Sequence, residues 1–157
     1  MYICTIGSGY VGLVSAACFA EMGNKVTCVD VNPQVVEKLN AGKVHIYEPG
    51  LEELVLRNHQ EGRLNFTTDL SEGMRDADFI FITMGTAWRE DGSCELSYVE
   101  EVDSDIGRNL QTTVIVEEKS TVPGGTADLV RGLIDGELKK RGKDIAFEVV
   151  SNPEFLK

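Results

Sequence analysis

The chain contains 157 residues, of which 42% are apolar and 26% are charged, so a globular fold is expected and disorder is excluded as its main description. Its net charge of −11 would repel a nucleic-acid backbone, and we therefore expect no nucleic-acid partner. No apolar run reaches the roughly 18 residues of a membrane span and the start does not read as a signal peptide, which predicts a cytoplasmic protein without a membrane partner.

Short apolar segments alternate with amphipathic segments along the chain. In chain order, we expect a strand at Tyr2–Ile6, a helix at Tyr10–Met22, a strand at Lys25–Val29, helices at Pro33–Ala41 and Leu51–Gln60, a strand at Leu64–Thr67, a short helix at Leu70–Arg75, a strand at Phe79–Met84, a helix at Ser97–Leu110, a strand at Thr113–Glu117, a helix at Thr126–Lys140 and a strand at Ile145–Val150. Such alternation predicts a parallel sheet with helices on both faces.

A glycine-rich turn follows the first expected strand and opens the first expected helix. It reads Gly7-Ser8-Gly9-Tyr10-Val11-Gly12, which is the pattern G-x-G-x-x-G. In this context Gly7 permits a tight turn, Gly9 lets the backbone approach a pyrophosphate, and Gly12 lets the helix pack closely on the strand. The helix N-terminus then offers free N–H groups to phosphates, so an acidic chain can bind an anionic ligand without lysines.

Asp30 ends the second expected strand, 18 residues after Gly12. A dinucleotide-binding fold places an acid there, because a carboxylate accepts hydrogen bonds from the adenosine ribose hydroxyls. The same carboxylate would repel a 2′-phosphate, which favours NAD over NADP. Together the two features predict an α/β fold with a doubly wound parallel sheet of about six strands, the Rossmann dinucleotide-binding fold. The alternatives are a helix-entry turn without a ligand and a simple cap at the end of the strand.

The four cysteines, Cys4, Cys18, Cys28 and Cys94, lack the spacing of a zinc site, so we expect no metal. Cys4 and Cys28 lie in strand-like segments and Cys18 lies in a helix-like one. These three positions predict buried, reduced thiols.

Longer motifs at the remaining strand ends and loops are more specific than the glycine pattern. They read GSGYVGLVSA at 7–16, YEPGLEEL at 47–54, DGSCELSYV at 91–99, KSTVPGGT at 119–126 and SNPEFLK at 151–157. In these motifs the whole chain resembles the UDP-glucose/GDP-mannose dehydrogenase family. The KSTVP form favours the UDP-glucose branch of that family over the GDP-mannose branch.

The resemblance implies an NAD-dependent oxidation of a sugar-nucleotide C6 alcohol to a carboxylate, in two steps that reduce two NAD. It assigns a group of residues to the cofactor: Gly7, Gly9, Tyr10, Val11, Gly12, Asp30, Thr86, Ser120 and Thr121. Thr121 and Glu154 match the family's catalytic threonine and glutamate, and a carboxylate at Glu154 can act as a general base or hold a water. Glu154, Phe155 and Leu156 match the beginning of the substrate-binding segment.

The family's catalytic cysteine and its basic substrate-binding residues lie beyond the end of this chain. We therefore expect residues 1–157 to be one NAD-binding domain, inactive alone, of a longer and homo-oligomeric enzyme that binds a UDP-sugar. Two alternatives are a stand-alone nucleotide-sensing Rossmann module and the NAD domain of another dehydrogenase, such as one acting on GDP-mannose.

Overall fold

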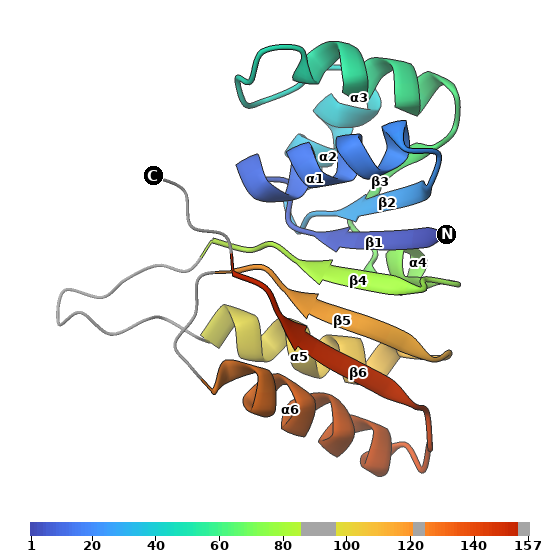
Figure 1. Ribbon diagram of the computed structural model, residues 1–157, viewed down its shortest axis with the longest axis vertical. Helices are drawn as coiled ribbons and strands as arrows, with labels where there is room; N and C mark the ends of the chain where they lie inside the picture. Colours follow the sequence, from blue (N-terminus) through green and yellow to red (C-terminus); the bar gives the residue numbers. More distant parts are fainter. Residues whose placement is uncertain (86–96, 121–124, 154–157) are drawn as a thin grey trace, which may run out of the picture.

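The computed structural model describes residues 1–85, 97–120 and 125–153 (Figure 1). Its strands form one six-stranded sheet with the order β3-β2-β1-β4-β5-β6. The strands are β1 (Tyr2–Ile6), β2 (Lys25–Val29), β3 (Leu64–Thr67), β4 (Phe79–Ile82), β5 (Val114–Glu118) and β6 (Phe147–Ser151). Every neighbouring pair in the sheet is parallel, which confirms the predicted doubly wound α/β architecture.

Helices cover both faces of the sheet. They are α1 (Tyr10–Glu21), α2 (Pro33–Asn40), α3 (Leu51–Gln60), α4 (Leu70–Met74), α5 (Ser97–Asn109) and α6 (Thr126–Lys140). One buried cluster joins α1, α2 and α3 to one face, and a second cluster joins α4, α5 and α6 to the other. Within the described ranges, no helix is both long enough and apolar enough to span a membrane.

Local capping explains where two of the helices begin. The Asn32 side chain accepts a hydrogen bond from the Gln34 N–H at 3.0 Å, and Pro33 occupies the first turn of α2. Asp69 likewise caps α4 by accepting from the Ser71 N–H at 2.8 Å. Both starts agree with the sequence prediction.

Strands β4, β5 and β6 have boundaries that differ from the prediction: β5 covers Val114–Glu118 instead of Thr113–Glu117, and β6 ends at Ser151 instead of Val150. β4 ends at Ile82 instead of Met84, because the next residue, Thr83, turns its hydroxyl as well as its N–H to the Ile6 carbonyl. β6 begins at Phe147 instead of Ile145, because Phe147 pairs with Val114, the first residue of β5. The apolar residues beyond these ends still pack against the core, which is why the sequence pattern extends past the strands.

The order of the strands reverses between β1 and β4, which lie side by side in the middle of the sheet (Figure 1). The crossovers from β1 and from β4 lead to opposite faces, so their carboxyl ends are not covered by one continuous connection. In open α/β sheets, ligands bind in the crevice that forms at such a point. The glycine-rich turn leaves β1 there.

Candidate functional site

The glycine-rich turn is built around close backbone contacts at Gly7 and Gly12. Gly7 has φ +103°, a conformation that side chains rarely adopt. A Cβ added at Gly12 would lie 1.9 Å from the Gly7 carbonyl oxygen and 2.4 Å from Thr83 Oγ1. By contrast, a Cβ added at Gly9 would have no atom within 4 Å. The turn therefore needs Gly12 for its packing, while the space in front of Gly9 is open.

Thr83, the residue directly after β4, supports this turn, and no motif in the sequence indicated it. Its buried hydroxyl donates to the Ile6 carbonyl at 2.8 Å and lies 3.2 Å from the Gly7 carbonyl oxygen. The sequence does show a hydroxyl-bearing residue, Thr83, directly after the apolar segment of β4. The role of this hydroxyl can be inferred only when the structure shows that β4 lies beside β1.

Asp30 stands at the end of β2 and is connected to the glycine-rich turn. Its Oδ2 accepts the Ser8 N–H at 3.0 Å and also the Ser8 hydroxyl, and its Oδ1 accepts the Asn32 N–H at 2.9 Å. The Gly7 N–H donates to the Val29 carbonyl at 2.8 Å, which joins the same two segments through the backbone. The predicted ribose acid thus lies next to the predicted phosphate-binding turn.

A cavity of about 280 Å³ opens where these segments meet. Its lining residues come from the ends of β1, β2 and β4 and from α5, and include Gly7, Ser8, Gly9, Asp30, Thr83 and Tyr98. The first N–H groups of α1 have no partner within the helix, and the N-cap residue, Gly9, has no side chain that could accept from them. Unpaired N–H groups, open space at Gly9 and a fixed carboxylate are what an NAD pyrophosphate and ribose require, so this site fits that cofactor.

Tyr10 and Val11 lie on the first turn of α1, where their side chains line a different cavity of about 440 Å³. This second cavity is mainly apolar and is bounded by α1, α3 and the segment at Glu48 and Pro49. The first cavity does not include these two side chains, so a contact with a phosphate there would involve only their backbone N–H groups.

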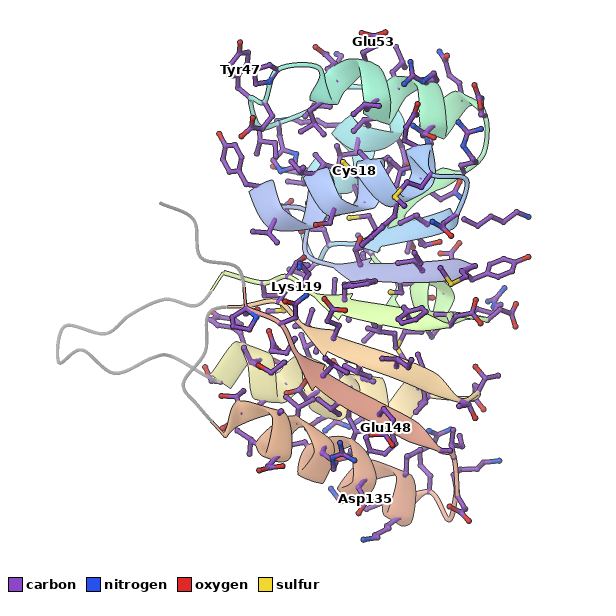
Figure 2. The ribbon with its side chains drawn as sticks, viewed as in Figure 1. Cys18, Tyr47, Glu53, Lys119, Asp135 and Glu148 are labelled. Atoms are coloured by element: carbon purple, nitrogen blue, oxygen red, sulfur yellow. The ribbon has the colours of Figure 1, made fainter. Side chains whose placement is uncertain are left out.

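Cys18 also lines the second cavity and is exposed, on α1 (Figure 2). The prediction that it is buried was wrong. α1 is apolar on most of its surface, so hydrophobicity alone did not indicate which side faces the sheet. Cys4 and Cys28 are buried and reduced as predicted, and burial raises the pKa of Cys28 to about 12. Neither buried thiol is therefore a thiolate near neutral pH.

Ser120 follows β5 at the same edge of the sheet, and it is 5% exposed. Its N–H donates to Glu118 Oε1 at 2.8 Å. Asp103 of α5 lies near Glu118, and both carboxylates are fully buried. Burial is the largest cause that raises the pKa of Asp103 to about 8, and the nearby carboxylates of Glu118 and Glu100 contribute to the same rise. No local pattern in the sequence indicates this pair, because Asp103 stands among other polar residues, as on a solvated helix face.

Several predicted site residues lie outside the described ranges. These are Thr86, Thr121, Glu154, Phe155 and Leu156, and Cys94 lies outside them as well. The structure therefore brings together the predicted residues of the turn with Asp30, and it places Ser120 at the end of β5.

Comparisons with known proteins agree with this geometry. The model of the UDP-glucose/GDP-mannose dehydrogenase family, NAD binding domain, matches residues 1–157. A UDP-glucose 6-dehydrogenase from Pseudomonas aeruginosa is 50% identical over 100% of this chain and 35% of its own length. The chain thus spans about a third of the length of the curated relatives it matches.

Solved structures show the same similarity. A ternary complex of GDP-mannose dehydrogenase from Pseudomonas aeruginosa superposes with a TM-score of 0.91 at 39% identity, over 100% of this chain and 37% of that one. A UDP-glucose dehydrogenase from Pyrobaculum islandicum has a TM-score of 0.88 at 42% identity, over 99% of this chain and 36% of that one. The chain belongs to the UDP-glucose/GDP-mannose dehydrogenase family, whose NAD-binding domain it matches along its full length.

Proposed function

We propose that the chain is the NAD-binding domain of a UDP-glucose 6-dehydrogenase. The observation that carries the proposal is the Asp30 carboxylate, held beside the glycine-rich turn by Ser8 at 3.0 Å. The proposal is supported by the UDP-glucose 6-dehydrogenase that is 50% identical over the whole chain. We also propose that residues 1–157 form one domain, in line with the single sheet and the extent of the family match.

Each part of the site has a separate role in this proposal. The turn from Gly7 to Gly12 and the N-terminus of α1 receive the pyrophosphate, and Asp30 accepts an adenosine ribose hydroxyl. Ser120 and Thr86 lie along the cofactor, which when bound accepts a hydride from the sugar C6. Thr121 and Glu154 orient the reacting carbon and its water, and Glu154, Phe155 and Leu156 begin the substrate-binding segment.

The reaction itself requires the parent protein. The second oxidation needs an activated cysteine, and Cys4 and Cys28 are buried with raised pKa values. We propose that a later part of the parent supplies this cysteine, the cations that hold the sugar nucleotide and the contacts of a homo-oligomer. The cytoplasmic location and the lack of nucleic-acid and membrane partners stay predictions.

A GDP-mannose 6-dehydrogenase is the second candidate for the parent, because the ternary complex of GDP-mannose dehydrogenase superposes with a TM-score of 0.91. Steady-state assays of the parent with UDP-glucose and with GDP-mannose separate the two candidates. We expect NADH formation with UDP-glucose and a kcat/KM at least about 100-fold lower with GDP-mannose. The reverse preference would assign the chain to the second candidate, and activity with neither would reject both.

A further inference from the structure

The acceptor sites of Asp30 are mostly occupied within the protein itself. A carboxylate offers about four lone-pair sites on its two oxygens. Ser8 uses two of them at Oδ2, through its N–H and its hydroxyl, and the Asn32 N–H uses one at Oδ1. Among the contacts of the described residues, one lone pair of Oδ1 is left for a ligand, so Oδ1 is the oxygen that can receive a ribose hydroxyl without breaking a bond.

The Ser8 side chain is almost fully buried next to Asp30, at the wall of the cavity. It is 1% exposed, whereas Asp30 is partly exposed and the following side chain, Val31, is 89% exposed. Because both its N–H and its hydroxyl donate to Oδ2, the hydrogen bonds of Ser8 act on a cofactor through the Asp30 carboxylate. Asn32 fixes the other oxygen and at the same time caps α2, so the carboxylate is held from two sides.

We infer that Ser8 is a positioning residue for cofactor selectivity: its buried hydroxyl holds Oδ2 and aims the free lone pair of Oδ1 into the cavity. Hydrogen bonds from a hydroxyl to a charged acceptor are among the stronger ones, so such a bond can hold the carboxylate in one orientation. The inference rests on the proposed NAD site. It adds Ser8 as the residue that orients Asp30, the acid that favours NAD over NADP. A carboxylate released from Ser8 could rotate, and it would then both bind the ribose and repel a 2′-phosphate less effectively.

Calorimetric titration of Ser8→Ala with NADH and with NADPH tests this inference. The backbone N–H at Ser8 remains, and only the hydroxyl is lost. We expect the affinity for NADH to fall about fivefold, as for a lost hydrogen bond, while the affinity for NADPH stays within about twofold, so the ratio of the two affinities narrows. In an Asp30→Ala background, Ser8→Ala should cause no further change in either affinity, because the group that it positions is gone.

Ser71→Ala is the matched control. Ser71 donates to Asp69 through both its hydroxyl, at 2.7 Å, and its N–H, at 2.8 Å, but neither residue lines the cavity. Ser71→Ala should leave the ratio of the NADH affinity to the NADPH affinity unchanged. The inference would be overturned if Ser8→Ala lowered the affinities for NADH and NADPH equally, or lowered neither of them. A parent sequence that binds no NADH at all would instead reject the proposed function.

Discussion

Asp103 and Glu118 lie near each other inside the protein, and both side chains are fully buried. Asp103 comes from α5 and Glu118 is the last residue of β5. Among the residues that the structure describes, both oxygens of Asp103 and Oε2 of Glu118 have no hydrogen-bond partner, and these atoms are shielded from water. Two buried carboxylates this close cannot both be charged without a large cost, so we conclude that Asp103 holds a proton near neutral pH.

This pair predicts how stability depends on pH. The pKa of Asp103 is about 8 in the folded protein and about 4 when unfolded, so the unfolded chain releases its proton first. The free energy of unfolding should therefore fall as the pH rises from about 4 to about 8, by up to about 1.4 kcal/mol per unit from this residue. Asp103→Asn, which cannot ionise, should reduce that slope and be more stable than the natural chain at pH 8.

Urea unfolding at several pH values measures how steeply the free energy of unfolding falls with pH in the natural chain and in Asp103→Asn. Asp105→Asn is the control, because Asp105 lies on the same helix but is 42% exposed and pairs with Arg108 at 2.7 Å. It should leave the slope of the natural chain unchanged. Parallel curves for Asp103→Asn and the natural chain would show that Asp103 ionises normally.

The two glycines of the turn should separate folding from binding. Gly12→Ala places a Cβ 1.9 Å from the Gly7 carbonyl oxygen, and we expect it to lower the free energy of unfolding by about 3 kcal/mol. Gly9→Ala has open space and should change that energy by less than about 0.5 kcal/mol. It should nevertheless weaken NADH binding about tenfold or more, because the Cβ occupies the space of the pyrophosphate.

Chemical denaturation and NADH titration of the same two variants check this prediction. Gly132→Ala controls for the added methyl group, since Gly132 lies in α6 with no atom within 4 Å of the added Cβ. It should stabilise the chain by about 0.5–1 kcal/mol and leave NADH binding unchanged. A Gly9→Ala variant that binds NADH normally would mean that the pyrophosphate lies elsewhere.

Thr121 and Glu154 are predicted to act on the reacting carbon of the parent. In the full-length enzyme, Thr121→Ala and Glu154→Gln should lower kcat by about 100-fold or more while the affinity for NADH stays within about twofold. Steady-state kinetics and calorimetry of the same preparations measure the two quantities. An equal loss of NADH affinity and turnover in both variants would reassign these residues to cofactor binding.

The order of elements could be predicted from the sequence because each strand and helix has its own local pattern. The turn from Gly7 to Gly12 and the acid at Asp30 also follow a fixed spacing, and the structure places them together. The hydrogen bonds from Ser8 to Asp30 and from Thr83 to Ile6 could not be predicted. They join residues 22 and 77 positions apart and depend on which strands are neighbours.

Which residues of a helix are buried was also hard to predict, because burial depends on which elements lie next to the helix. Asp103 lies in a segment with Glu100, Glu101 and Asp105, so its burial between α5 and the sheet leaves no local signal. Cys18 shows the opposite case, an apolar residue on the open side of an apolar helix. In both cases packing against other elements decides the environment, and a pattern read along one helix does not contain that information.

Calorimetric titration of the chain and of Asp30→Ala with NADH and NADPH tests the central claim most directly. We predict that the natural chain binds NADH at least about tenfold more tightly than NADPH, because Asp30 accepts a ribose hydroxyl and repels a 2′-phosphate. Asp30→Ala should narrow this difference by weakening NADH and strengthening NADPH. Equal binding of the two cofactors by the natural chain, or no effect of Asp30→Ala on their ratio, would contradict the assignment of Asp30 and the NAD site built around it.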